Sequence, residues 1–342
     1  MNAFEEARKR WDGVAKPLDG LGVFEDMITG IAALTGDPNV DISKRAVVVM
    51  CADNGVVSEG VTQTDAGVTG IMAEKIALGE SSVCVMAREA GCDVFAVDIG
   101  MNEKRSAVRD LSIRRGTGNI AREAAMSRDE AVRAIDTGKE LAGELKGKGY
   151  RLIMTGEMGI GNTTVSAALA SILLSVDPGI TVGRGAGLSD KGLERKKEVV
   201  RCAVNAFIKG GFDPNDPIEL LSRLGGLDVA GMAGLFLGGH EYRVPVVIDG
   251  FISSVAALIA YLIDRSCKDA MIASHVSDEP AAGMVIDRLG LRAPINAGMK
   301  LGEGTGAVMM GPLLDMALSV YNSSLTFSKA SVGKYEHYGD KP

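Results

Sequence analysis

The chain has 342 residues, of which 24% are charged and 46% hydrophobic, and its formal net charge at pH 7 is −7. This composition is typical of a globular protein, and the length predicts one large domain with a smaller one beside it. The acidic balance argues against a nucleic-acid-binding protein, which usually presents a basic face. An anionic small molecule could still bind through backbone N–H groups.

The N-terminal segment, MNAFEEARKRWDGVAKPLDG, is charged and lacks the apolar core of a signal peptide. No apolar run reaches the roughly 18 residues that a membrane span requires. Five widely spaced cysteines without a CxxC pattern indicate reduced thiols. These features predict a cytoplasmic protein without a membrane partner. With three histidines in the chain, we expect no histidine-rich metal centre.

Short apolar runs alternate with longer helical patterns along the chain. The runs are nearly continuous and rich in β-branched residues, as in parallel strands that are covered on both faces. They span 46–52, 93–99, 151–155, 244–248 and 269–273. Helices are predicted at about 66–77, 128–146, 163–174, 190–208, 228–237 and 253–263. The alternation predicts an α/β fold with a doubly wound, mainly parallel sheet and helices on both faces.

The two ends of the chain carry helical patterns but no strand pattern. We therefore expect a Rossmann-like α/β catalytic domain over residues 36–303. A small helical subdomain would be formed by residues 1–35 and 304–327. The polar stretch 328–342 is predicted to be a loosely ordered tail.

Four predicted strands lead directly into glycine, acidic or hydroxyl residues. These loops begin at Asp53, Gly156, Asp249 and Ser274. Ligands of open parallel sheets bind at the carboxyl ends of the strands. We therefore expect the four loops to converge on one ligand site.

The loop GEMGIGNTT, residues 156–164, is the best phosphate-binding candidate. Gly159 and Gly161 would let backbone N–H groups approach an anion. Asn162 and Thr163 could cap the following helix and hydrogen-bond phosphate oxygens. An ordinary tight turn with helix capping is the alternative. The loop lacks the lysine of a Walker motif and does not match the dinucleotide-binding GxGxxG pattern.

Two further glycine-rich loops contain charged residues. Residues 183–188, GRGAGL, precede a basic cluster that includes Lys196, which suits either a phosphate site or a solvated helix face. Residues 300–306, KLGEGTG, place Glu303 among glycines just before a helix. Glu303 could act as a general base, or could simply be a negative charge at a helix N-terminus.

Seven sequence blocks occur in a fixed order and together resemble one enzyme family. They are ADNGVVSEGVT, GEMGIGNTT, GRGAGL, LGGLDVAGMAG, VIDGFISS, SHVSDEP and KLGEGTGA. The resemblance, from about residue 20 to 320, is to the nicotinate-nucleotide–dimethylbenzimidazole phosphoribosyltransferases, which activate the lower ligand of cobamides. It implies transfer of the phosphoribosyl group of nicotinate mononucleotide to a benzimidazole-like base. Nicotinate leaves and C1′ inverts. The resemblance also implies a homodimer that needs no metal or redox cofactor.

The resemblance assigns roles to individual residues of this chain. Glu303 matches the general base, and Glu157 matches a second active-site carboxylate that would hold ribose hydroxyls or favour positive charge on the sugar. The residues that match the phosphate and nucleotide site are Gly159, Gly161, Asn162, Thr163, Gly185, Lys196, Asp249, Gly250 and Ser277.

The pocket for the acceptor base departs from the family pattern. The family usually has a serine and an aromatic residue where this chain has Thr62 and Thr64, and a glutamine where it has Gly70. Leu301 is the fourth residue expected in this pocket. The departures leave benzimidazole, purine and phenolic acceptors open.

Two other functions remain as alternatives. A nucleotide-dependent oxidoreductase could use the same kind of sheet, although the GxGxxG fingerprint is missing. A non-catalytic nucleotide-binding partner subunit would also fit the altered acceptor pocket.

Overall fold

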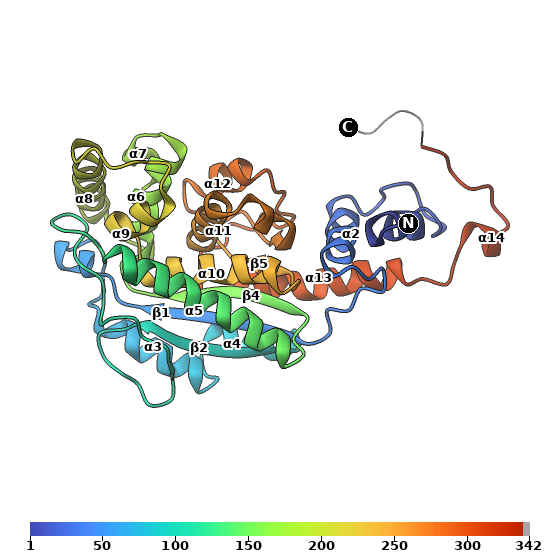
Figure 1. Ribbon diagram of the computed structural model, residues 1–342, viewed down its shortest axis with the longest axis horizontal. Coiled ribbons are helices and arrows are strands. Elements are labelled where there is room, and N and C mark those ends of the chain that lie inside the picture. The colour runs from blue at the N-terminus through green and yellow to red at the C-terminus, as the bar shows by residue number, and fades with distance from the viewer. Residues whose placement is uncertain (338–342) are drawn as a thin grey trace.

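The computed structural model describes residues 1–337 and contains a six-stranded sheet (Figure 1). Neighbouring strands are parallel, and the order across the sheet is β3-β2-β1-β4-β5-β6. This order is that of a doubly wound α/β fold, with its topological switch point between β1 and β4. The predicted fold class is therefore confirmed. The strands are β1 (Arg45–Ala52), β2 (Cys92–Gly100), β3 (Arg109–Asp110), β4 (Leu152–Met158), β5 (Val246–Ile248) and β6 (Met271–Ala273).

Five of these strands coincide with the predicted apolar runs, with two differences. β3 is a pair of exposed charged residues at the sheet edge, so no apolar run reveals it. β4 continues three residues beyond the predicted run, because Gly156, Glu157 and Met158 still pair with β1. Glu157 therefore lies on a strand and not in the loop that follows.

All six predicted helices are present. The eight-residue helices α4, α9 and α12 escape prediction, because two turns repeat the apolar period too few times. The helices are α1 (Ala3–Trp11), α2 (Val23–Thr35), α3 (Gly67–Ala77), α4 (Ser82–Glu89), α5 (Arg128–Gly147), α6 (Asn162–Leu174), α7 (Pro178–Thr181), α8 (Asp190–Lys209), α9 (Pro217–Leu224), α10 (Leu227–Glu241), α11 (Phe251–Ile263), α12 (Ala282–Leu289), α13 (Thr305–Tyr321) and α14 (Phe327–Ala330). Two 3₁₀ turns are η1 (Gly55–Glu59) and η2 (Arg265–Ala270).

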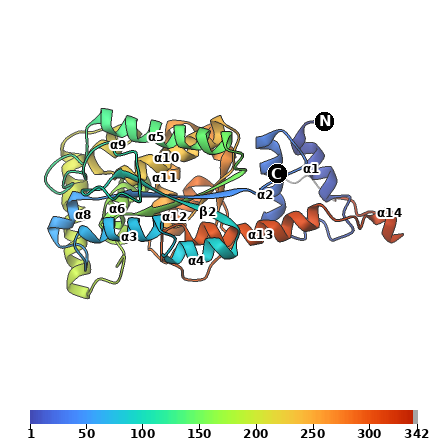
Figure 2. The same cartoon turned by 90° about the horizontal axis from the view of Figure 1, so that it is seen from below.

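Helices cover both faces of the sheet, as predicted (Figure 2). β1 explains this arrangement, because alternate side chains of a strand point to opposite faces. Val48 and Met50 enter the hydrophobic core that includes α5, α10 and α11, whereas Val47 and Val49 enter the core that includes α3, α4 and α13. All four side chains are fully buried, which explains the continuous apolar run.

The two ends of the described chain meet beside the sheet (Figure 1). The rings of Trp11 in α1 and Tyr321 in α13 are buried and pack edge to face, with centroids 4.9 Å apart. α13 contacts β4 and β5 as well as α2, so it joins the sheet to the terminal helices. The predicted domain boundaries at residues 36 and 303 stay a prediction. Residues 338–342 of the predicted tail lie outside the described part.

No helix within residues 1–337 is both long enough and apolar enough to cross a membrane. The cytoplasmic location stays a prediction.

Candidate active site

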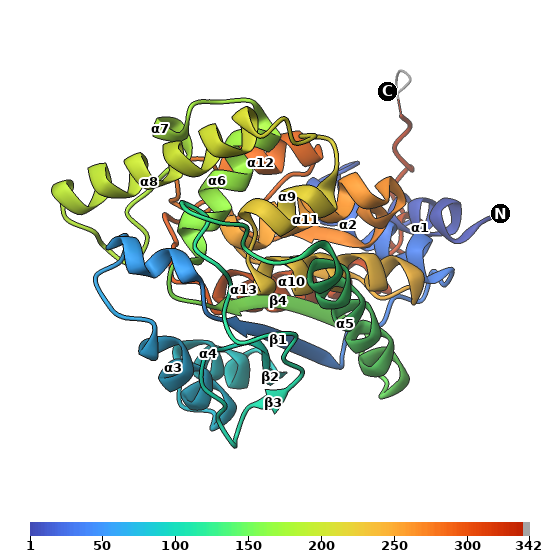
Figure 3. The same cartoon turned by 60° about the vertical axis from the view of Figure 1, so that its left-hand side comes forward.

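A cavity of about 320 Å³ opens where β4, β5 and β6 end. Figure 3 turns this end of the sheet forward, with η1, α6 and α8 around it. Three of the predicted loops converge on the cavity. The fourth, after β1, supports it from behind, since Asn54 Nδ2 donates to the Ile160 carbonyl at 3.3 Å. Most of the lining residues come from segments 61–64, 157–163, 184–188, 249–253, 275–279 and 300–303.

The N-terminus of α6 faces the cavity and carries the predicted phosphate-binding residues Gly159, Gly161, Asn162 and Thr163. Gly161 is the N-cap, and no side chain caps this helix. The N-terminal N–H groups and the positive end of the helix dipole therefore favour an anion there. Gly161 has a φ of 91°, and a Cβ would lie 2.9 Å from Val57 Cγ2, so glycine is required at this position.

Lys196 in α8 lies against this helix terminus and is almost fully buried. Its Nζ donates to Thr163 Oγ1 at 2.7 Å and to the Gly183 carbonyl at 3.1 Å. Both partners are uncharged, and burial lowers the pKa of Lys196 to about 8. A buried amine next to an open helix N-terminus suits a phosphate group.

Glu279 lies in the same part of the cavity, and the sequence reasoning did not select it. The Gly185 N–H, also predicted to bind phosphate, donates to Glu279 Oε1 at 3.0 Å. Its other oxygen, Oε2, is buried and has no hydrogen-bond partner among the described residues. The motif SHVSDEP contains Glu279, but the sequence alone does not reveal that it meets a loop 94 residues earlier.

Glu303 is held at the cavity by an unusual backbone. Gly302, Glu303 and Gly304 have φ values of 82°, 61° and 97°, so three consecutive residues are left-handed. Such strain at a non-glycine residue persists only where its surroundings fix it. Asp249 supplies part of that support by accepting hydrogen bonds from the N–H groups of Gly304 and Gly306 at 3.2 and 2.7 Å.

The Glu303 side chain is largely buried and reaches α4. Its Oε2 accepts a hydrogen bond from the Val83 N–H at 3.2 Å. Glu157 lies close to the residue before Glu303. Its Oε1 is 2.6 Å from the position that a Cβ on Gly302 would take. The two predicted catalytic carboxylates therefore come together in one cavity, although 146 residues separate them in the chain (303 − 157 = 146).

Glu157 belongs to a buried acidic group. Burial, together with the negative charges of Asp228 and Asp249, raises the pKa of Glu157 well above its usual range. The side-chain amide of Asn162 donates to both Glu157 and Asp228. Burial also raises the pKa of Asp228 to about 6. Asn162 therefore orients Glu157, and this contact differs from the predicted bond to a phosphate oxygen.

The remaining predicted residues divide into two sets. Gly250 and Ser277 line the cavity, as do Thr62, Thr64 and Leu301 of the expected acceptor pocket. Gly70 is not among the lining residues. The Arg105 guanidinium packs against it, with Nε 2.9 Å from where a Cβ on Gly70 would lie. Phe251 is the only phenylalanine, tyrosine or tryptophan among the described residues that line the cavity.

Comparisons with known proteins identify the family of this chain. A family model described as "Phosphoribosyltransferase" matches residues 1–332. The relative from Ruminiclostridium cellulolyticum is 40% identical over 338 residues, covering 98% of this chain and 95% of its own. The relative from Acetivibrio thermocellus is 41% identical and covers 96% of this chain and 93% of its own. Both are named nicotinate-nucleotide–dimethylbenzimidazole phosphoribosyltransferase.

A solved structure agrees with these relatives. The crystal structure of CobT from Thermus thermophilus matches with a TM-score of 0.90 at 36% identity, and the match covers 97% of this chain and 99% of that one. Sequence and fold therefore agree along nearly the whole chain. The protein is a member of the nicotinate-nucleotide–dimethylbenzimidazole phosphoribosyltransferase family.

Proposed function

We propose that this enzyme transfers the 5-phosphoribosyl group of nicotinate mononucleotide to a nitrogen of a benzimidazole-like base. The products are nicotinate and a nucleotide of the α-ribazole-5′-phosphate type, for use in cobamide assembly. The observation that carries the proposal is the combination in one cavity of two neighbouring carboxylates, an uncapped helix N-terminus and a buried lysine. The named activity of the relatives supports the same reaction.

The donor phosphate would bind at the N-terminus of α6. The N–H groups near Gly161 and the Lys196 amine provide the positive potential there. This contact would place the ribose between α6 and the carboxylates. Glu157, whose pKa burial raises well above its usual range, would hydrogen-bond a ribose hydroxyl.

Glu303 would act as the general base. The attacking base loses its N–H proton as the new bond to C1′ forms, and that proton passes to the Glu303 carboxylate. The electrons of the old C1′–N bond leave with nicotinate. Inversion at C1′ requires the two bases to lie on opposite faces of the ribose, with direct transfer between them.

The experiment is incubation of the purified enzyme with nicotinate mononucleotide and one base at a time. The panel contains 5,6-dimethylbenzimidazole, adenine and a simple phenol, because residues 61–64 leave the acceptor class open. Chromatography measures nicotinate release and the new nucleotide together. If no base yields both products, the proposal is wrong and a nucleotide-binding subunit becomes the better interpretation.

We also propose that the enzyme is a homodimer that uses the outer face of α3, α4 and α13. Apolar side chains stand exposed there, namely Ile71, Leu78, Val85, Met309 and Met316. Exposed apolar patches are typical of protein interfaces, and we propose that these residues form one. Met316→Glu should shift the mass seen by light scattering towards the monomer. Ile208→Glu on α8, which replaces an equally exposed side chain elsewhere, is the control, and a dimer unaffected by Met316→Glu would refute this face.

A further inference from the structure

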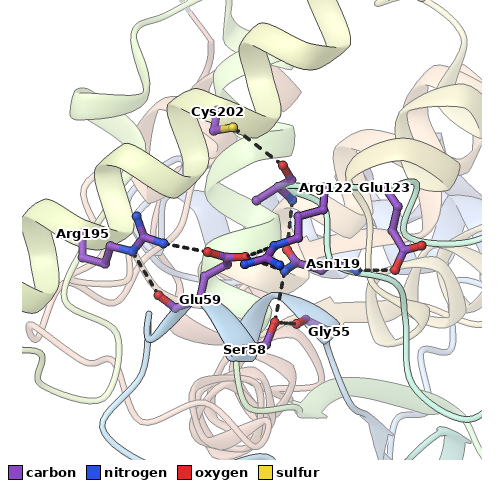
Figure 4. Close-up of polar contacts among 9 residues, drawn as sticks. Gly55, Ser58, Glu59, Asn119, Arg122, Glu123, Arg195 and Cys202 are labelled. Atoms are coloured by element: carbon purple, nitrogen blue, oxygen red, sulfur yellow. Dashed lines mark hydrogen bonds and ion pairs between the residues drawn. The ribbon is translucent and has the colours of Figure 1, made fainter.

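Glu59, the last residue of η1, holds a hydrogen-bond network outside the catalytic cavity (Figure 4). Its side chain is only 7% exposed. It accepts from Asn119 Nδ2 at 2.8 Å, Arg122 Nε at 2.6 Å and Arg195 Nη2 at 2.6 Å. A single surface ion pair contributes little, but several donors on one buried carboxylate fix its position.

Arg195 holds the main chain of Glu59 as well as its side chain. Its Nε donates to the Glu59 carbonyl oxygen at 3.1 Å, beside the ion pair to the carboxylate (Figure 4). Gly60 follows with a left-handed φ of 71° and turns the chain. Val61, Thr62 and Thr64 then line the cavity. The acceptor wall, residues 61–64, therefore begins two residues after the point that Arg195 holds.

The same helix carries the donor side of the cavity. Lys196 follows Arg195 on α8, and successive helical side chains point about 100° apart. Lys196 faces Thr163 at the phosphate site, whereas Arg195 faces Glu59. A second contact crosses the cavity, because the Gln63 side-chain amide donates to the Gly187 carbonyl. The acceptor wall is thus connected to the donor side at two points.

We propose that Arg195 and Glu59 are positioning residues that set the acceptor wall against the phosphate site, with Gln63 as a second connection. This inference rests on the proposed phosphoribosyl transfer, and it names the residues that align the two substrates of that reaction. The attacking nitrogen and C1′ must approach to about 3–3.5 Å in line, and a misplacement of about 1 Å can cost about 100-fold in rate. The donor is held by Lys196 and α6, so breaking the pair displaces chiefly the acceptor.

The test is two-substrate kinetics with matched variants. Arg195→Met removes both contacts to Glu59 and should lower kcat/KM for the acceptor by about tenfold or more. The dissociation constant of nicotinate mononucleotide, measured by calorimetry, should change by less than about twofold. Gln63→Ala should act in the same direction, and because Gln63 is exposed, this variant tests the proposal even if Arg195→Met folds poorly. Arg122→Met is the control.

Arg122 donates to the same carboxylate, but its side chain is 72% exposed and does not come from α8. Arg122→Met should therefore keep the kcat/KM for the acceptor within about twofold of the wild-type value. The dependence of the acceptor KM on salt gives a further test, because a purely structural role of Arg195 would not make KM depend on salt. Since the Arg195 side chain is 46% exposed, raising the NaCl concentration should raise the acceptor KM of the wild type but not of Arg195→Met.

Two results would overturn the proposal. Unchanged acceptor kinetics in both Arg195→Met and Gln63→Ala, with wild-type turnover intact, would leave the network a purely structural role. Absence of nucleotide formation by the wild type with every base would overturn the proposed function, and this inference with it.

Discussion

The lowered pKa of Lys196 should make the affinity for a phosphorylated donor depend on pH. Burial lowers that pKa to about 8 in the free enzyme. A phosphate dianion favours the charged amine, so binding should raise the pKa again and take up a proton. The affinity is therefore fully present below about pH 8 and falls as the pH rises through this value. At pH 7 about nine tenths of the amine is charged, and at pH 9 about one tenth, so the dissociation constant of nicotinate mononucleotide should rise about tenfold, or about 1.4 kcal/mol.

Titration calorimetry at both pH values measures this change. Phosphate itself, with a second pKa of about 6, stays doubly ionised over the range and does not contribute. Lys196→Met should weaken binding at pH 7 and remove most of the pH dependence. Lys197→Met is the matched control, because Lys197 lies next on α8 and pairs with Glu194 at 2.8 Å instead of facing the cavity.

Two outcomes would refute this reasoning. One is a tenfold loss of affinity between the two pH values that persists in Lys196→Met, since another group would then be titrating. The other is a flat wild-type profile, which would mean that Lys196 keeps its charge despite burial. Proton uptake offers an independent check, because the apparent binding enthalpy at about pH 8.5 should depend on the ionisation enthalpy of the buffer in the wild type only.

Three further predictions concern the cavity. Glu303→Gln should keep donor affinity but lower kcat by about 10²–10⁴-fold in a nicotinate-release assay. The amide oxygen can still accept the hydrogen bond from the Val83 N–H, but it cannot take up a proton. Unchanged turnover would remove the general-base role. Glu279→Gln should tighten donor binding about fivefold by calorimetry, because it removes a negative charge, only one oxygen of which has a hydrogen-bond donor within the described chain, beside the proposed phosphate site, and weaker binding would contradict this. Gly161→Ala should lower the free energy of unfolding in urea by about 1–3 kcal/mol, whereas the control Gly147→Ala, without a neighbour to clash with, should not.

The strands and the loops of the site follow from local sequence patterns. Continuous apolar runs such as 46–52 identify strands, because both faces of this sheet are covered. Glycines next to Glu157 and Glu303 mark places where the backbone must turn sharply or approach closely. In a parallel sheet such loops meet at one edge, so their convergence could be predicted without knowing any contact.

Contacts between distant segments could not be predicted in this way. Asp249 was expected to face the nucleotide, but its oxygens also accept N–H groups at the start of α13, more than 50 residues away (304 − 249 = 55). Glu279 meets Gly185, and Glu59 meets Arg195, over separations that no local pattern records. Gly70 was assigned from a family position alone, and Arg105 occupies the space beside it.

The cavity has two halves that differ in what they are made of. In the proposed assignment, backbone N–H groups at the start of α6 and Lys196 form the donor half, so recognition there would depend on glycines and helix geometry more than on side-chain shape. In the same assignment, residues 61–64, which line the cavity on an irregular segment, form part of the acceptor half. Residues 61–64 belong to no strand, whereas a side chain on Gly161 would meet Val57 and need a left-handed backbone. On this assignment, substitutions in residues 61–64 would change the acceptor without changing the donor, and the panel of bases tests the acceptor of this chain directly.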